Sequence, residues 1–354
     1  MLEDLLVIET AAVLAGPAVG MHFAELGARV IKIENKRSGG DVTRKWKLPT
    51  EDPNSPVSAY FSSVNWGKEH RMLNLTDVED QKTFDILLIQ ADVLITNHLE
   101  ADAEKLGLSR ERVQALNPTL IHGHIKGFAA QPQRPAFDVV LQAETGYISM
   151  TGTADHPAKL PIALIDVLAA HQLKQGILLA LWQRDRTGKG AYVEVSLEAA
   201  ALSGLINQAS NFLMAEAVAK PLGTLHPNIA PYGELFTCAD GGRIILAVGS
   251  DAQFAALCTT LGQTTLAMDP RFVRNTDRVM NRVDLAALLA RSIATHARDE
   301  LLGALLKAQV PAGAVNDIRE ALATPLAQRM TLTSEIDGKP TRRIRGNAFR
   351  IEPY

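Results

Sequence analysis

Over its first 128 residues the chain alternates between segments with helical spacing and short extended runs. An apolar run at 5–9 is followed by a helical stretch at 21–26 and by the alternating segment "ARVIKIE" at 28–34. The same order recurs with a helix at 78–90 before a strand at 92–96, and with a helix at 110–116 before a strand at 120–128. This alternation is typical of a parallel sheet covered by helices, so the sequence predicts an α/β, Rossmann-like fold.

The second half of the chain contains a long helix and then a region of different character. Residues 167–184 are predicted to form a helix that is apolar nearly all round and must be buried by this chain or by another, before a strand at 191–196. The Pro-, Gly-, His- and Asn-rich stretch 219–231 indicates a linker. A hairpin at 233–249 and helices at 252–261 and 282–297 follow it. We expect a large domain at 1–218, a small α+β domain at 219–325 and a C-terminal segment, 326–354, that returns to the large domain.

Composition excludes several classes of partner. The net charge of −3 comes from interspersed acids and bases, which argues against nucleic acid and against a polybasic membrane patch. No apolar run approaches the roughly 18 residues of a membrane span, and no basic leader precedes one. The only cysteines, Cys238 and Cys258, are expected to be small core residues in a reducing compartment. The sequence therefore predicts a cytoplasmic protein without a membrane partner.

Two kinds of site are disfavoured by spacing. The loop after the first strand contains Gly16 and Gly20 but no G-x-G-x-x-G, so the tight turn that a bound dinucleotide needs is missing. His122 and His124 lie two apart on a predicted strand and share a face, but no third metal ligand can be identified. We expect this pair to form a hydrogen-bonded strand face, and we predict no metal site.

The stretch "LPIALIDVLAA" at 160–170 places one carboxylate, Asp166, in an apolar run. Immediately before a helix, an aspartate is a strong N-cap whose oxygen accepts from the first-turn amides. The same amides and the helix dipole would keep the carboxylate ionised, as a nucleophile must be. Local sequence favours the N-cap and leaves the nucleophile open.

Eight segments of the chain match, in the same order, segments of one enzyme family. They lie at 13–18, 38–46, 65–75, 91–97, 117–128, 137–152, 165–197 and 226–241. On these segments the chain resembles the class III CoA-transferases, which include formyl-CoA transferase and carnitine CoA-transferase and have alpha-methylacyl-CoA racemase as a relative.

The resemblance implies a Rossmann-like large domain, a smaller domain and a homodimer of two interlocked subunits. It makes Asp166 the nucleophile that attacks the thioester of an acyl-CoA, which gives a mixed aspartyl anhydride and CoA thiolate. A small carboxylic acid then exchanges in and CoA returns. The activity expected is therefore transfer of CoA between an acyl-CoA and a free carboxylic acid.

The resemblance also implies the residues that contact coenzyme A. They are Leu14, Ala15, Asn35, Leu73, Asn74, Leu75, Thr76, Asn97, His98, Lys105, Arg134, Pro135, Ala136 and Phe137. In support, the small residues Ala15, Gly16 and Ala18 leave room for close approach of a ligand, and Lys105 can neutralise phosphate charge.

Two alternatives stay open. The racemase relatives carry a histidine where this chain has Phe137, and a phenyl ring cannot move an alpha proton, so transfer is favoured over epimerisation. A catalytically silent CoA-binding homologue is the other alternative. The segment 97–105, "NHLEADAEK", lacks the family's usual basic residue, and no glycine-rich lid loop can be found.

Overall fold

A computed structural model describes residues 1–352 and divides the chain into two compact units. Within the described residues, the first unit comprises 1–148, 159–219 and 329–352, and the second comprises 149–158 and 220–328. The segment 149–158 thus belongs to the second unit, although it lies within the range expected for the large domain. The domain boundaries at 218 and 325 stay a prediction.

The first unit is built on a six-stranded parallel sheet in the order β3-β2-β1-β4-β5-β8. Its strands are β1 Leu6–Glu9, β2 Arg29–Asn35, β3 Lys68–Leu73, β4 Val93–Thr96, β5 Ile121–Lys126 and β8 Ala191–Ser196. All five pairings are parallel. The predicted α/β class is therefore confirmed, and five of the strands lie where the sequence placed them.

The strand that the sequence did not predict is β3. Its residues, "KEHRML", are mostly polar or charged and show no apolar alternation. It lies at the edge of the sheet, where one side has no strand neighbour and polar side chains are tolerated.

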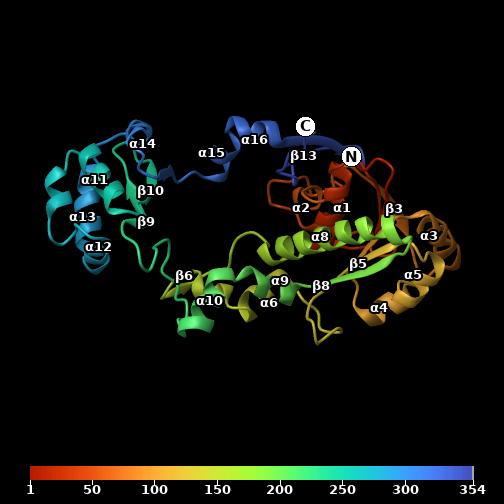
Figure 1. The fold of residues 1–354 in the computed structure, drawn as a ribbon. Coiled ribbons are helices and arrows are strands. Elements are labelled where there is room, and N and C mark those ends of the chain that lie inside the picture. Colours follow the sequence, from red (N-terminus) through yellow and green to blue (C-terminus); the bar gives the residue numbers. More distant parts are fainter. Residues whose placement is uncertain (353–354) are drawn as a thin grey trace. The chain divides into compact units, whose positions relative to one another are not determined.

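Helices cover both faces of this sheet (Figure 1). The helical elements of the unit are α1 Ala15–Glu25, η1 Val42–Lys45, α2 Ala59–Ser62, α3 Val78–Gln90, α4 Glu100–Lys105, α5 Arg110–Leu116, α6 Asp138–Glu144, α8 Leu164–Thr187, α9 Leu197–Gly204 and α10 Ile206–Ala215. The short helix α7 Tyr147–Met150 crosses the boundary to the second unit. Helices α1 and α8 pack together on one face, while α3 and α5 close an apolar core with Ile8, Ile31 and Leu94. A C-terminal hairpin of β12 Thr331–Ile336 and β13 Lys339–Ile344 completes the unit.

Helix α8 is longer than the sequence predicted, and this chain buries only part of it. It begins at Leu164 and ends at Thr187, three residues beyond the expected helix at each end. One side packs in the core, but Leu178, Leu179 and Trp182 are 38%, 67% and 57% exposed.

By length and composition alone α8 is also apolar enough to cross a membrane, which corrects the expectation that no run approaches that length. The core helix of a globular protein passes the same test, so this is weak evidence for a span.

The second unit is a small α+β structure. Its strands are β6 Gly152–Thr153, β7 His156–Pro157, β9 Tyr232–Thr237, β10 Arg243–Ala247 and β11 Ala312–Ala314. Its helices are α11 Asp251–Thr260, η2 Thr264–Met268, α12 Asn275–Met280, α13 Arg282–Ile293, α14 Arg298–Lys307 and α15 Ile318–Leu322, and α16 Pro325–Met330 crosses the boundary between the units. The expected hairpin is the antiparallel pair β9–β10. Cys238 and Cys258 are free and buried in this core, as predicted.

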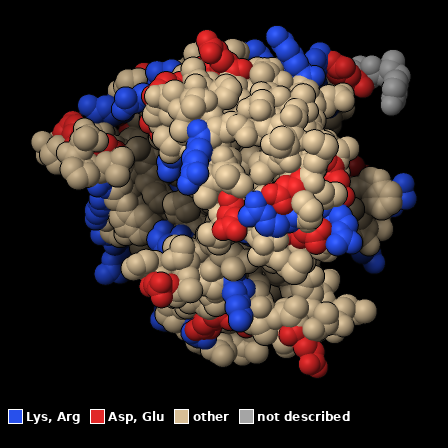
Figure 2. All heavy atoms as spheres, turned by 90° about the vertical axis from the view of Figure 1, so that its left-hand side faces the viewer, with Lys and Arg blue, Asp and Glu red and all other residues tan. Residues whose placement is uncertain are grey.

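Charges of both signs are mixed on the surface. On the face shown in Figure 2, blue and red side chains are scattered among larger areas of other residues. This agrees with the small net charge of −3.

Candidate active site

A cavity of about 760 Å³ opens at the carboxyl ends of the parallel strands. Its lining includes residues at or just after the ends of four strands, namely Thr10 after β1, Asn35 in β2, Leu73 in β3 and His98 after β4. Strands β1 and β4 are neighbours whose connections run in opposite directions along the sheet. Open α/β sheets bind ligands at this kind of switch point, outside the carboxyl ends of the strands.

The cavity brings together half of the residues expected to contact coenzyme A. These are Asn35, Leu73, Asn74, Leu75, Thr76, His98 and Lys105. The other expected contacts, and Asp166, do not line it. These are Leu14, Ala15, Asn97, Arg134, Pro135, Ala136 and Phe137.

The expected residues outside the cavity have other contacts. Asn97 Nδ2 donates a hydrogen bond to the Ala12 carbonyl at 2.8 Å, and Asn97 Oδ1 accepts one from the Ala12 amide at 3.0 Å. Asn97 therefore fixes a loop that does line the cavity. Arg134 pairs with Glu144 at 2.5 Å and lies over the ring of Phe128. Phe137 is 55% exposed and belongs neither to the core nor to the cavity.

The small residues after β1 serve internal packing. A Cβ on Gly16 would lie 2.3 Å from the Cβ of Ala11, and the helix could not approach the loop so closely. At this position the sequence predicted room for a ligand. The structure shows that Gly16 makes room for the chain's own loop.

Cations stand at the rim of the cavity. Arg37, Lys45 and Lys105 are exposed and line it, and Lys45 donates to the Ser38 carbonyl at 3.1 Å. The sequence reasoning named only Lys105 and missed Arg37 and Lys45. The basic stretch "NKRSGG", directly after a predicted strand, was the available signal.

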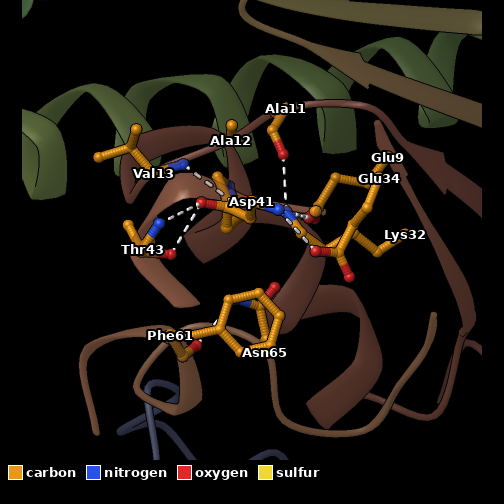
Figure 3. Close-up of polar contacts among 12 residues, drawn as sticks. Glu9, Ala11, Ala12, Val13, Lys32, Glu34, Asp41, Thr43, Phe61 and Asn65 are labelled. Carbon is orange, nitrogen blue, oxygen red and sulfur yellow. Dashed lines mark hydrogen bonds and ion pairs between the residues drawn. The ribbon is translucent and has the colours of Figure 1, made fainter. Parts of the chain in front are cut away.

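A buried charge network forms the floor of the cavity (Figure 3). Lys32 Nζ lies 3.0 Å from Glu9 Oε1 and 3.2 Å from Asp41 Oδ2, and it donates to the Ala11 carbonyl at 2.7 Å. Lys68 Nζ lies 2.9 and 2.8 Å from the two oxygens of Glu9. Burial lowers the pKa of Lys68 to about 7.

This network holds the loop after β1 in a strained form. Val13 has a φ of 74°, a conformation that a β-branched residue rarely adopts. Its amide donates to Asp41 Oδ2 at 3.2 Å, and the same oxygen is paired with Lys32. The strained loop and the cavity floor are therefore one connected structure.

Asp166 does not have the capping role that local sequence predicted. Helix α8 begins two residues earlier, at Leu164, and Ala163 is its N-cap. The cap is supplied from outside the helix, because Asp138 Oδ1 accepts from the amides of Ile165 at 2.6 Å and Asp166 at 3.4 Å. Asp166 makes no capping hydrogen bond and is 8% exposed.

Its electrostatic surroundings also differ from those expected. Burial, and then the charge of Asp138, raise the pKa of Asp166 to about 7, so the first turn of α8 does not keep it strongly ionised. Burial together with the charges of Asp166, Asp138 and Asp41 raises the pKa of Tyr60 to about 12. Tyr60 therefore lies near Asp166 and near the acidic floor of the cavity. The sequence reasoning missed Asp138, Gln142 and Tyr60, although the i, i+4 pair of Asp138 and Gln142 could be read in "FDVVLQ".

The two histidines on β5 form the hydrogen-bonded strand face that was predicted. Thr96 Oγ1 lies 3.0 Å from His122 Nε2 and 2.8 Å from His124 Nδ1. Burial lowers the pKa of His122 to about 3 and that of His124 to about 4, so both rings are neutral. In residues 1–352 no three or more His, Cys, Asp or Glu side chains are grouped so that they could hold a metal ion.

A doubly wound parallel sheet with a cavity at its carboxyl edge defines an α/β domain of the nucleotide-binding type. The family model described as CoA-transferase family III matches residues 2–352, so the chain belongs to that family. It is 35% identical to the succinate–glutarate CoA-transferase of Agrobacterium fabrum, over 96% of this chain and 86% of that protein. It is 34% identical to the acetyl-CoA:oxalate CoA-transferase of Acetobacter aceti, over 99% and 89%. A CAIB/BAIF family protein from Brucella suis has a solved structure that matches with a TM-score of 0.88 at 36% identity, covering 99% of this chain and 92% of that one.

Proposed function

We propose that the protein transfers CoA from an acyl-CoA to a free carboxylic acid, with Asp166 as the nucleophile. The observation that carries the proposal is membership of CoA-transferase family III over residues 2–352. The buried carboxylate of Asp166, in the first turn of α8, supports it.

The steps proposed for Asp166 balance without a further reactant. The carboxylate attacks the thioester carbonyl, the C–S bond breaks, and a mixed anhydride and CoA thiolate result. The thiolate attacks the aspartyl carbonyl, releases the donor's carboxylate and leaves an aspartyl-CoA thioester. The acceptor carboxylate attacks that thioester to form a second anhydride. The thiolate then takes the new acyl group and frees Asp166. No proton or electron is consumed.

The acceptor is proposed to be a small dicarboxylic acid. The names of the two relatives contain succinate, glutarate and oxalate, all of which are dicarboxylates. The assay pairs to try first are therefore succinyl-CoA with glutarate, and acetyl-CoA with oxalate.

Coenzyme A is proposed to place its nucleotide in the cavity at the carboxyl edge of the sheet. Three cations at the rim, Arg37, Lys45 and Lys105, can pair with its phosphates. The basic residue missing from 97–105 is then replaced by side chains that follow β2. No metal is needed in this scheme.

The cavity assignment predicts weaker CoA binding when a rim cation is removed. Arg37→Ala and Lys105→Ala are each expected to weaken CoA binding about tenfold, because each removes a charge-assisted contact to phosphate. Calorimetry at two salt concentrations measures this, and pantetheine, which has no nucleotide phosphates, should be unaffected. Lys82→Ala is the matched control, since Lys82 is 65% exposed and pairs with Glu79 on α3. An equal loss in the control would show that the cavity is not the CoA site.

Trapping of the acyl intermediate tests the catalytic role. With succinyl-CoA and hydroxylamine, peptide mass spectrometry should find a hydroxamate on Asp166, because hydroxylamine captures an activated acyl group. A silent CoA-binding homologue would bind CoA and yield no hydroxamate. A racemase would exchange the alpha proton of its acyl-CoA with deuterated water in the absence of an acceptor acid, and the 55%-exposed phenyl ring of Phe137 offers no base for that step.

A homodimer of interlocked subunits is part of the proposal. Helix α8 carries the exposed apolar side chains Leu178, Leu179 and Trp182, and α10 exposes Leu213 and Met214 by 77% and 86%. Apolar surface of this extent is typical of a protein interface. A cytoplasmic location stays a prediction.

A further inference from the structure

The start of α8 is fixed by a side chain from another helix. Asp138, the first residue of α6, uses one carboxylate oxygen to accept from the amides of Ile165 and Asp166, at 2.6 and 3.4 Å. These amides belong to the first turn of α8, which has no side-chain cap of its own. The position of Asp166 therefore depends on Asp138.

Gln142 fixes Asp138 in turn. It lies one turn further along α6 and is 0% exposed. Its Nε2 donates to the second oxygen of Asp138 at 2.5 Å, and its Oε1 accepts from the Leu160 amide at 2.8 Å. Both oxygens of Asp138 are thus occupied, and the segment that leads into α8 is tied to the same pair.

The two carboxylates, Asp138 and Asp166, differ in the hydrogen-bond donors around them. Amide and side-chain donors point to both oxygens of Asp138. Asp166 receives no such capping contact, and its pKa is raised to about 7 by burial and by Asp138. Tyr60 on α2 is the other ionisable group that interacts with this pair, and the charge of Asp41 acts on Tyr60 as well. On α8 itself the next charged side chain, Lys174, lies about 12 Å further along the axis, beside His22 and Glu25 of α1.

We propose that Asp138, held by Gln142, is a positioning residue that aims Asp166 and decides at which pH it becomes a nucleophile. The inference rests on the proposed function and concerns how the pH dependence of that same site is set. The protonated form of Asp166 is unreactive, so activity rises as the proton is lost. Asp138 itself forms no bond to the acyl group.

Asp138→Asn separates the two parts of this role. The asparagine oxygen can still accept from the Ile165 amide, while its amino group replaces the oxygen that accepts from Gln142 Nε2. The substitution therefore removes the negative charge beside Asp166 together with the hydrogen bond from Gln142, and Gln142→Leu shows the effect of losing that hydrogen bond alone. We expect the midpoint of the pH–rate profile with succinyl-CoA and glutarate to fall by about 1–2 pH units from its wild-type value near 7. The rate above about pH 8 should change by only a few-fold. A carbon-13 carboxyl titration of the free protein should show the same shift of Asp166 without any turnover.

Gln142→Leu is the matched control, because it breaks the hydrogen bonds and changes no charge. It should lower the rate at every pH and leave the midpoint in place. If Asp138→Asn also lowers the rate evenly and leaves the midpoint unmoved, Asp138 is only a structural cap and the inference is wrong. The proposed function fails in a different way, namely if wild-type protein gives no hydroxamate on Asp166.

Discussion

Replacing Asp166 by asparagine is expected to abolish CoA transfer and, above neutral pH, to make the protein more stable. The loss of rate should be about 10⁴-fold or more, because the amide is not a nucleophile and the covalent route is closed. CoA binding should persist, since Asp166 does not line the cavity assigned to the nucleotide.

The gain in stability follows from the raised pKa of Asp166. Its carboxyl titrates near 7 in the folded chain against an ordinary value of 3.8, so folding favours the protonated form. That contribution is complete below about pH 4 and is lost as the pH rises through about 7. Above this range the wild type holds a buried, ionised carboxylate at a cost on the order of 4 kcal/mol. Asparagine has the same shape and no charge, so its benefit grows with pH.

Urea denaturation of wild type and Asp166→Asn at about pH 5 and about pH 8 measures this difference. Asp185→Asn is the control, since Asp185 lies on the same helix and is exposed. It should change the free energy of unfolding little at either pH. If Asp166→Asn raises the free energy of unfolding no more at about pH 8 than at about pH 5, burial does not destabilise the ionised carboxylate of Asp166.

Strands could be predicted from the sequence where several consecutive residues are buried and apolar. Strands such as β2, with five consecutive buried residues, carry an apolar signal that parallel sheets require. Strand β3 lacks that signal, because an edge position does not demand apolar side chains. Helix α8 was predicted to be buried by this chain or by another, and composition does not say which of its apolar residues this chain leaves exposed.

The site was predictable only in part, for a related reason. The family resemblance named Asn35, Leu73 and His98 as contacts of coenzyme A, and all three line the cavity. Capping across helices is invisible to local reasoning. Asp138 and Ile165 are 27 positions apart, and nothing in "LPIALIDVLAA" shows that an outside carboxylate occupies the first-turn amides. The raised pKa of Asp166 comes first from burial and then from the charge of Asp138, and neither can be predicted from the local sequence.

The buried network beneath the cavity leads to the largest expected loss of stability. Glu9→Gln removes the carboxylate that faces both Lys32 and Lys68, whose side chains are 1% and 0% exposed. A carboxamide cannot balance two buried ammonium groups, and breaking a buried ion pair costs about 3–5 kcal/mol. Gly20 shows how closely the fold is built around this group, since a Cβ there would lie 1.8 Å from Glu9 Oε2.

The cost of Glu9→Gln should depend on pH in a direction that Lys68 sets. Its pKa is lowered by burial to about 7 against an ordinary value of 10.5, so folding favours the neutral amine, and stability falls as the pH drops from about 10.5 to about 7. Without Glu9 the charged form of Lys68 is less stable in the folded protein. Glu9→Gln should therefore lower the free energy of unfolding more at about pH 6 than at about pH 9.

Chemical denaturation at these two pH values tests the prediction, with Glu69→Gln as the control. Glu69 pairs with Arg29 at 2.6 Å with both side chains about half exposed, and its loss should cost about 1 kcal/mol or less. Lys32 also donates to the Ala11 carbonyl and pairs with Asp41 Oδ2, the same oxygen that accepts from the Val13 amide. Glu9→Gln should therefore make the strained loop less ordered and weaken CoA binding as well. Equal costs for the two substitutions would mean that the network neither supports the fold nor shapes the cavity floor.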